Sequence, residues 1–94
     1  MPRPLLFAAL VAASLLPSAV AWGDPGTQRA RELFKQGESH YGLSHFADAL
    51  VSYEKAYEAK PLPGFLFNIG QCHRQLGHWE TAARTYRRDR KSVV

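Results

Sequence analysis

The sequence predicts an all-α fold, an α-solenoid in which antiparallel helix pairs stack in a row. The first observation is apolar spacing by three and four along residues 65–76, which is typical of one buried helical face. The residues of this face are Leu66, Ile69, Cys72, His73 and Leu76. The second observation is that this stretch matches the chain 33 residues earlier. The matched pairs are Phe67/Phe34, Gly70/Gly37, His73/His40, His78/His45, Ala82/Ala49 and Tyr86/Tyr53, with Leu66/Leu33 and Trp79/Phe46 as conservative matches. One fixed offset across two helices is the signature of a helical repeat.

Residues 1–21 are expected to be a signal peptide. Arg3 gives a positive start, the stretch 5–16 is apolar, and small residues at 19–21 place the cleavage before Trp22. The apolar run is about a dozen residues, whereas a membrane span needs roughly 20. The chain is therefore predicted to be exported, to a periplasm or outside the cell, with no membrane span after cleavage. An uncleaved membrane anchor is the alternative.

The mature chain is expected to begin with a leader over residues 22–29, followed by the first repeat unit over residues 30–63. Thr27 is expected to cap the first helix, which covers residues 30–41. Ser44 is expected to cap the second helix, over residues 45–60. Pro61 and Pro63 then stop that helix.

The second unit is predicted over residues 64–88. Its first helix covers residues 65–76, and Gly77 ends this helix in a left-handed conformation. A second helix follows from Trp79. Gly70 lies in mid-helix, where glycine costs about 1 kcal/mol against alanine, so we expect it to allow close approach of a neighbouring helix, as Gly37 does in the first unit.

This pattern resembles the tetratricopeptide repeat (TPR), whose unit is a pair of antiparallel helices about 34 residues long. The family favours glycine, alanine, an aromatic residue or proline at set positions of the unit. The chain departs from these preferences at three positions. His40 and His73 stand where the family favours an aromatic residue, and Ser44 stands where it favours glycine. The resemblance implies that repeat packing is carried by Gly37, Phe46, Ala49, Tyr53, Ala56, Pro61, Gly70, Gly77, Trp79, Ala82 and Tyr86.

The match ends at Asp89, where the family has alanine and a buried carboxylate would lack a partner. Residues 89–94 resemble the translation of a sequencing adapter, a hypothesis under which the second unit is truncated and the natural protein continues with more repeats. The alternative is a natural short charged tail. Long-read sequencing of the locus separates the two.

Charge does not point to nucleic acid. The formal net charge of +4 falls to about +2 once Arg3 and the charges of residues 89–94 are set aside. Nucleic-acid binding needs a clustered basic face, and Arg84, Arg87 and Arg88 at helical spacing are interpreted as a solvated surface. Repeat arrays usually need about three units for stability, so the chain is expected to be marginally stable or to self-associate.

Neither a metal site nor a cofactor is predicted. His40 and His73 are equivalent positions in successive units, as are His45 and His78. Equivalent helices lie about 10 Å apart, too far for two imidazoles to share a zinc ion at about 2 Å each. The single cysteine, Cys72, is expected to be a buried, inert thiol, with an intermolecular disulfide as the alternative.

Catalysis has no support in the sequence. It contains no nucleophile with a base and an orienting acid, no phosphate loop and no cofactor motif. Asp48, Glu54 and Glu58 are interpreted as solvated residues of one helix. The chain is therefore not expected to be an enzyme, although a catalytic domain downstream of a truncated chain stays open.

In the TPR family the first helix of each unit lines a concave groove that takes an extended peptide or a helix of a partner. The resemblance implies groove residues Arg31, Phe34, Glu38, Tyr41, Phe67, Asn68, Gln71 and Arg74. Phe34 and Phe67 would form a stacked pair of exposed rings that anchors an apolar side chain, or each would pack against the neighbouring helix. The family's clamp for a terminal carboxylate has lysine where Phe34 stands, so that specificity is not implied.

Two functions follow as expectations. The first is an exported protein–protein interaction module that binds a partner's peptide or helix in its groove. The second is a structural role, as the N-terminal segment of a longer multi-repeat scaffold or of a multidomain protein. The identity of the partner does not follow from the residues.

Overall fold

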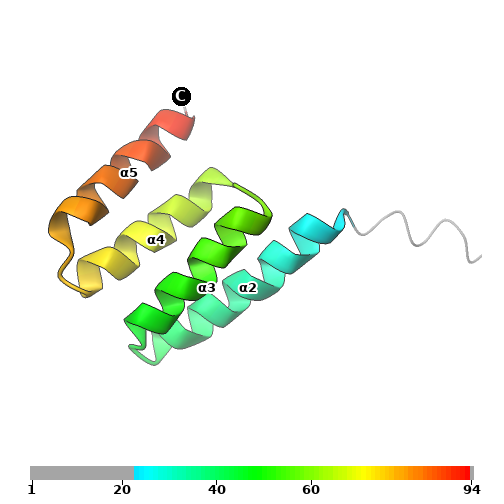
Figure 1. Ribbon diagram of the computed structural model, residues 1–94, viewed down its shortest axis with the longest axis horizontal. Helices are drawn as coiled ribbons and strands as arrows, with labels where there is room; N and C mark the ends of the chain where they lie inside the picture. The colour runs from blue at the N-terminus through cyan, green and yellow to red at the C-terminus, as the bar shows by residue number, and fades with distance from the viewer. Residues whose placement is uncertain (1–22, 94) are drawn as a thin grey trace, which may run out of the picture.

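The computed structural model describes residues 23–93, which form four α-helices and contain no strand. These are α2 (Pro25–Gly42), α3 (Phe46–Ala59), α4 (Pro63–Gln75) and α5 (Trp79–Val93) (Figure 1). The all-α prediction is confirmed for this part of the chain. The expected signal peptide lies outside the described residues. None of the described helices has the length and apolar character needed to cross a membrane.

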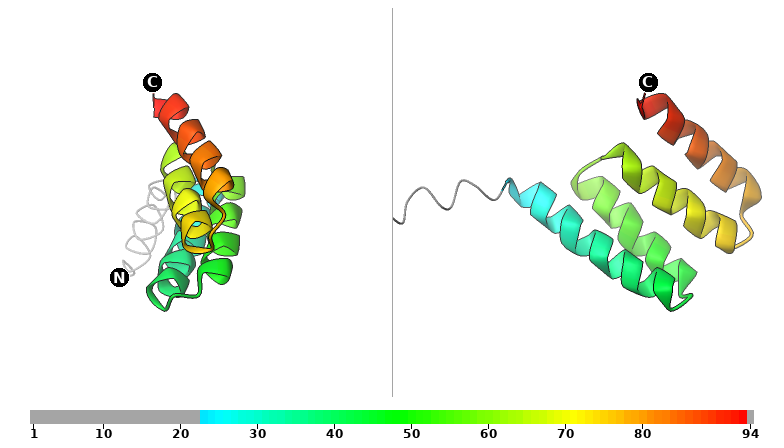
Figure 2. Two further views of the ribbon diagram at one scale, coloured as in Figure 1. Left: turned by 90° about the vertical axis from the view of Figure 1, so that its left-hand side faces the viewer. Right: turned by 180° about the vertical axis from the view of Figure 1, so that it is seen from behind.

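The four helices form two antiparallel hairpins, and each helix packs against the next one along the chain. α2 packs on α3, α3 on α4 and α4 on α5 (Figure 1). The view from behind shows the same order, with α2 and α5 at opposite sides of the row (Figure 2). Side chains also join the first helices of the hairpins, since the rings of Phe34 in α2 and Phe65 in α4 have centroids 5.7 Å apart.

The first helix begins earlier than expected, at Pro25 within the predicted leader. Asp24 is its N-cap, and its Oδ1 accepts a hydrogen bond from the backbone N–H of Thr27 at 2.7 Å. The expectation that Thr27 itself caps the helix is therefore wrong. Proline at the first helical position fits, because its missing N–H has no helical partner there. The Thr27 backbone N–H lowers the pKa of the Asp24 carboxyl, and the Nζ of Lys60 lies 3.6 Å from its Oδ2.

The two hairpin turns share one backbone conformation, closed by the same hydrogen bond. The N–H of His45 donates to the carbonyl of His40 at 2.8 Å, and the N–H of His78 donates to that of His73 at 2.8 Å. Gly77 has φ +80, so its predicted left-handed conformation is confirmed. Ser44 holds the equivalent place with φ 63. It does not cap α3 as expected, since the N-cap is His45 and no side chain caps that helix.

Replacing Ser44 with glycine is expected to raise the free energy of unfolding by about 1 kcal/mol. A non-glycine residue in the left-handed region costs about 1–3 kcal/mol, from which the extra unfolded-state entropy of glycine, about 0.5–1 kcal/mol, is subtracted. Gly77→Ser is the reciprocal variant and is expected to lower stability by a similar amount. Urea denaturation measures both. A Ser44→Gly protein less stable than the parent would contradict the strain assigned to this turn.

Two groups of buried side chains hold the helices together. The first joins α3 to α4 and contains Ala49, Tyr53, Leu66, Ile69 and Cys72. The second joins α2 to α3 and contains Ala30, Leu33 and Ala56. On α5, Ala82 is 3% exposed and Thr85 is 6% exposed. The apolar spacing by three and four therefore marks the faces that the helices bury against one another.

A glycine faces a tyrosine ring in each hairpin. A Cβ on Gly37 would lie 2.6 Å from Cε1 of Tyr53, and a Cβ on Gly70 would lie 2.5 Å from Cε1 of Tyr86. Real Cβ atoms essentially never approach other heavy atoms so closely. Both glycines are buried, so each one lets the ring of the second helix lie against the backbone of the first.

Trp79 does not pack as expected, because 67% of its side chain is exposed. Its equivalent in the first hairpin, Phe46, rests edge-on against the ring of Tyr41 with centroids 5.0 Å apart. Arg74 stands 33 residues after Tyr41 and offers no ring to Trp79. Pro61, also expected to pack, is exposed in the link between α3 and α4.

The last helix continues past Arg88, where the resemblance to the repeat ends. α5 has 15 residues, and Arg90 and Lys91 lie in its last turn, where positive charge suits the helix dipole. Asp89 is half-buried rather than enclosed. Its equivalent Ala56 is fully buried because α3 packs between α2 and α4, whereas the described helix that packs against α5 is α4.

Candidate functional site

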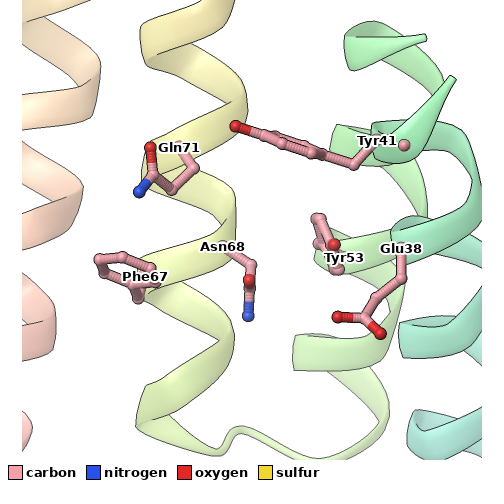
Figure 3. Close-up of a pocket in the computed structure, with 7 residues that line it drawn as sticks. Glu38, Tyr41, Tyr53, Phe67, Asn68 and Gln71 are labelled. Carbon is pink, nitrogen blue, oxygen red and sulfur yellow. The ribbon is translucent and has the colours of Figure 1, made fainter. Parts of the chain in front are cut away.

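A pocket of about 470 Å³ lies between the first helices of the two hairpins. Its wall on one side comes from α2 and on the other from α4 (Figure 3). Five of the eight predicted groove residues line it. The lining consists of Glu38, Tyr41, Gly42, Tyr53, Phe67, Asn68 and Gln71. We call this pocket the groove.

The α2 side of the groove carries an acid and a phenol, and α3 adds a second phenol at the base. The Tyr41 ring reaches from α2 toward α4 (Figure 3), and its Oη accepts a hydrogen bond from Nε2 of Gln75 at 3.4 Å. Glu38 is exposed at the rim. Tyr53 forms part of the base and is 3% exposed, and its burial, with a smaller effect of the Glu38 charge, raises its pKa to about 12. The phenol is therefore neutral and remains a hydrogen-bond donor at ordinary pH.

The α4 side combines an exposed ring with two amides. Phe67 is 48% exposed. The Nδ2 of Asn68 donates to the carbonyl of Gly64 at 3.2 Å, so its amide lies alongside α4, on the side of that helix that faces Glu38 (Figure 3). The Oε1 of Gln71 is buried and has no hydrogen-bond partner among the described residues. A buried acceptor without a partner costs about 1–3 kcal/mol, and a donor in the groove would remove that cost once the Gln71 amide turns to expose this oxygen.

Three predicted groove residues lie elsewhere. Arg31 and Arg74 are exposed and do not line the groove. Phe34 is half-buried, and its ring centroid lies 5.6 Å from that of Tyr53 and 5.7 Å from that of Phe65. The Phe67 ring instead neighbours Tyr86 at 5.9 Å. Phe34 and Phe67 thus have separate ring partners and do not form a stacked pair, so of the two alternatives the arrangement fits packing of each ring against a neighbouring helix.

Each turn also carries a pair of histidines. The ring centroids of His40 and His45 are 6.3 Å apart. In the second turn the Nδ1 atoms of His73 and His78 are 3.1 Å apart, so one ring donates to the other. Burial, followed by the neighbouring His78, lowers the pKa of His73. His73 is therefore the neutral imidazole of this hydrogen-bonded pair at pH 7.

Asp48 joins the first histidine pair. Ligand atoms of His40, His45 and Asp48 all lie within 4.8 Å of one another. The sequence-based expectation compared histidines of successive units and missed this group within one unit. The spacing of five and then three residues across a short helix turn is the signal that could have found it.

Cys72 is a free thiol with no exposed surface. Burial raises its pKa to about 11, which keeps it protonated and unreactive at neutral pH. The arrangement fits the expected inert thiol, since an intermolecular disulfide would require α3 and α4 to part.

Comparisons of the chain with models of known families, with curated proteins and with solved structures found no match. The likeness to the TPR therefore rests on the chain's own residues. Its two hairpins repeat three arrangements 33 residues apart. These are a glycine against a tyrosine ring, a histidine pair at the turn, and the backbone hydrogen bond that closes the turn.

Proposed function

We propose that the chain is an exported TPR-type interaction module, an α-solenoid whose groove binds an extended peptide of a partner protein. The groove between α2 and α4 carries this proposal, because it places an exposed ring beside amide groups. Phe67 supplies apolar surface for one peptide side chain. The amides of Asn68 and Gln71 are suited to the backbone of an extended peptide, which presents an N–H and a C=O at each residue.

The groove also favours one kind of peptide. Glu38 is exposed on the α2 side, and the aromatic wall is formed by Tyr41, Tyr53 and Phe67. A peptide with an apolar side chain next to a basic residue would suit both the aromatic wall and the Glu38 carboxylate. The basic side chain would pair with Glu38 at the rim, where such a contact contributes more to selectivity than to affinity.

The test is selection of binders from a displayed random-peptide library on the untagged chain, followed by affinity measurements with variants. Phe67→Ala and Gln71→Leu are each expected to weaken the selected peptides by about tenfold or more, since a central anchor contributes roughly 2 kcal/mol. Val51→Ala is the matched control, because Val51 is also 48% exposed but lies on α3 outside the groove. It is expected to change affinity less than twofold.

Phe34→Ala is not a clean probe of the groove, because Phe34 packs against Tyr53 and Phe65. Amide NMR mapping of a selected peptide gives the second readout. Chemical-shift changes centred on α5 or on the part of α3 away from Tyr53, or equal losses in the Phe67 and Val51 variants, would overturn the groove assignment. So would a library from which no peptide is enriched.

A second candidate is a structural segment of a longer scaffold. A pocket of about 430 Å³ lies along α5 and is lined by Phe67, Ala83, Tyr86, Arg87, Asp89 and Arg90. In the first hairpin, the ring equivalent to Phe67 is Phe34, and Phe65 of the following hairpin covers it. A further hairpin would cover Phe67 in the same way. The complete reading frame tests this candidate, and it fails if no helical repeat follows.

A further inference from the structure

The turn between α2 and α3 brings together three side chains that ligate metals. His40 lies in the last turn of α2, His45 is the N-cap of α3 and Asp48 lies in its first turn. Their ligand atoms all lie within 4.8 Å of one another. None of the three lines the groove, so this cluster is separate from the peptide-binding proposal.

We propose that this turn is a zinc-binding site with His40, His45 and Asp48 as its three protein ligands. Zinc binds imidazole nitrogen at about 2.0–2.1 Å and carboxylate oxygen at about 2.0–2.2 Å, almost always in tetrahedral geometry. Two such ligand atoms are then about 3.4 Å apart. The ligand atoms now lie within 4.8 Å of one another, so each pair must come closer by about 1.5 Å or less. Side-chain rotation can supply this movement, because His45 and Asp48 are exposed and have room to rotate.

The backbone of the turn is already fixed. The His45 N–H donates to the His40 carbonyl at 2.8 Å, which ties the two histidines to each other. A second bond, from the Leu43 N–H to the same carbonyl at 3.1 Å, closes the end of α2. Binding therefore orders side chains and leaves the backbone in place, which keeps its entropy cost small.

The donor set and the local charge select the ion. Two imidazoles and one carboxylate suit zinc, whereas calcium and magnesium prefer sites made of oxygen. The carboxylate of Asp48 adds a negative charge, whereas the negative end of α2 and the positive end of α3 meet at this turn and offset each other. Three protein ligands leave one tetrahedral position for water, so the ion is expected to exchange with added chelators.

The second turn provides a control within the same chain. His73 and His78 match His40 and His45, but Thr81 stands where Asp48 would be. An Nη atom of Arg84 donates to the Thr81 hydroxyl at 3.2 Å, which places a positive charge beside this turn. The Nδ1 atoms of the two histidines are already hydrogen-bonded at 3.1 Å. Glu54 of α3 acts on His73 by its charge, but among the described residues no carboxylate oxygen clusters with His73 and His78 as Asp48 does with His40 and His45. With a cation beside it instead, this turn is not expected to bind zinc.

Zinc titration of the untagged full chain by isothermal calorimetry tests the assignment. We expect one equivalent of zinc to bind. Asp48→Asn, which keeps the shape of the side chain, and His45→Asn are each expected to weaken binding by at least tenfold. His78→Asn is the matched control and is expected to change the zinc affinity less than twofold. Circular dichroism of each variant checks that the helices are retained.

Histidine ring resonances give an independent readout, and those of His40 and His45 are expected to shift with zinc while those of His73 and His78 stay in place. A dissociation constant weaker than about 1 mM would overturn the proposal. It would also fail if Asp48→Asn and His45→Asn bound zinc like the parent chain, or if His78→Asn lost as much affinity as His45→Asn.

Discussion

Leu66→Ala is expected to lower the free energy of unfolding by about 3 kcal/mol, within the range of about 2–5 kcal/mol for a leucine truncated in a packed core. Leu66 is 2% exposed and is among the largest fully buried side chains. It lies in the buried group that joins α3 to α4, so its loss weakens the contact between the two hairpins. Rigid neighbours from both helices would not collapse fully into the space left behind.

The loss expected for Leu66→Ala is a large part of the total free energy of unfolding. A folded region of this size has about 4–10 kcal/mol of stability in total, so about 1–7 kcal/mol would remain and the variant is expected to unfold at a clearly lower temperature and urea concentration than the parent. Leu62→Ala is the matched control, because Leu62 is 43% exposed in the link before α4, and its effect should stay below about 1 kcal/mol. Thermal and urea unfolding measure both variants. Equal losses would contradict the central position assigned to Leu66.

Gly37→Ala is expected to lower stability by about 1–2 kcal/mol, although alanine is the better helix former. The new methyl group would lie 2.6 Å from the Tyr53 ring, and overpacking of this kind costs about 1–3 kcal/mol or more. Helix propensity returns about 1 kcal/mol. Tyr53 is 3% exposed and is enclosed by α2 and α4, so its ring has little room to move away.

Two further alanine variants calibrate this result. Nothing lies within 4 Å of a Cβ on Gly64, so Gly64→Ala should leave stability unchanged or raise it. Gly70→Ala meets the Tyr86 ring at 2.5 Å, but Tyr86 is half-buried on α5 and can shift at lower cost. The expected order of loss is Gly37, then Gly70, then Gly64. A stabilising Gly37→Ala, measured in urea, would rule out a tight helix contact.

The helices and their buried faces were predictable because both follow from periodicity. A residue repeated every three or four positions must lie on one face of a helix, and that face is the one buried around Leu66 and Tyr53. The offset of 33 carried further information, because a contact predicted in one hairpin reappears in the other. Gly37 and Gly70 were expected to allow close helix contacts, and each faces a tyrosine ring.

Features that depend on one neighbour were not predictable from the pattern. Trp79 was expected to pack because Phe46 matches it, but its exposure follows from Arg74 standing where the first hairpin has Tyr41. The start of α2 was placed too late because the cap is the Asp24 carboxylate, which precedes the apolar repeat. Periodicity describes a helix interior and says little about its ends.

For the groove, too, some features were predictable from the repeat pattern and others depend on individual neighbours. The resemblance implied which helix positions face the concave side, and five of the eight residues line one pocket. It left open whether Phe34 would be exposed or packed against a neighbouring helix, because its contact with Phe65 depends on side-chain size in the next unit. The unpartnered Oε1 of Gln71 also depends on all its neighbours at once, and such a property is not carried by spacing.

The buried position of Cys72 makes its thiol a probe for the separation of neighbouring helices. The thiol has no exposed surface and a pKa of about 11, so a labelling reagent reaches it only after α3 and α4 have moved apart. The rate of labelling therefore measures how often Cys72 becomes exposed, and comparison with the rate of complete unfolding gives the share that comes from opening of the contact between the hairpins. Because the chain has one cysteine, every labelled molecule reports on that same contact, with no mutation needed to install the probe.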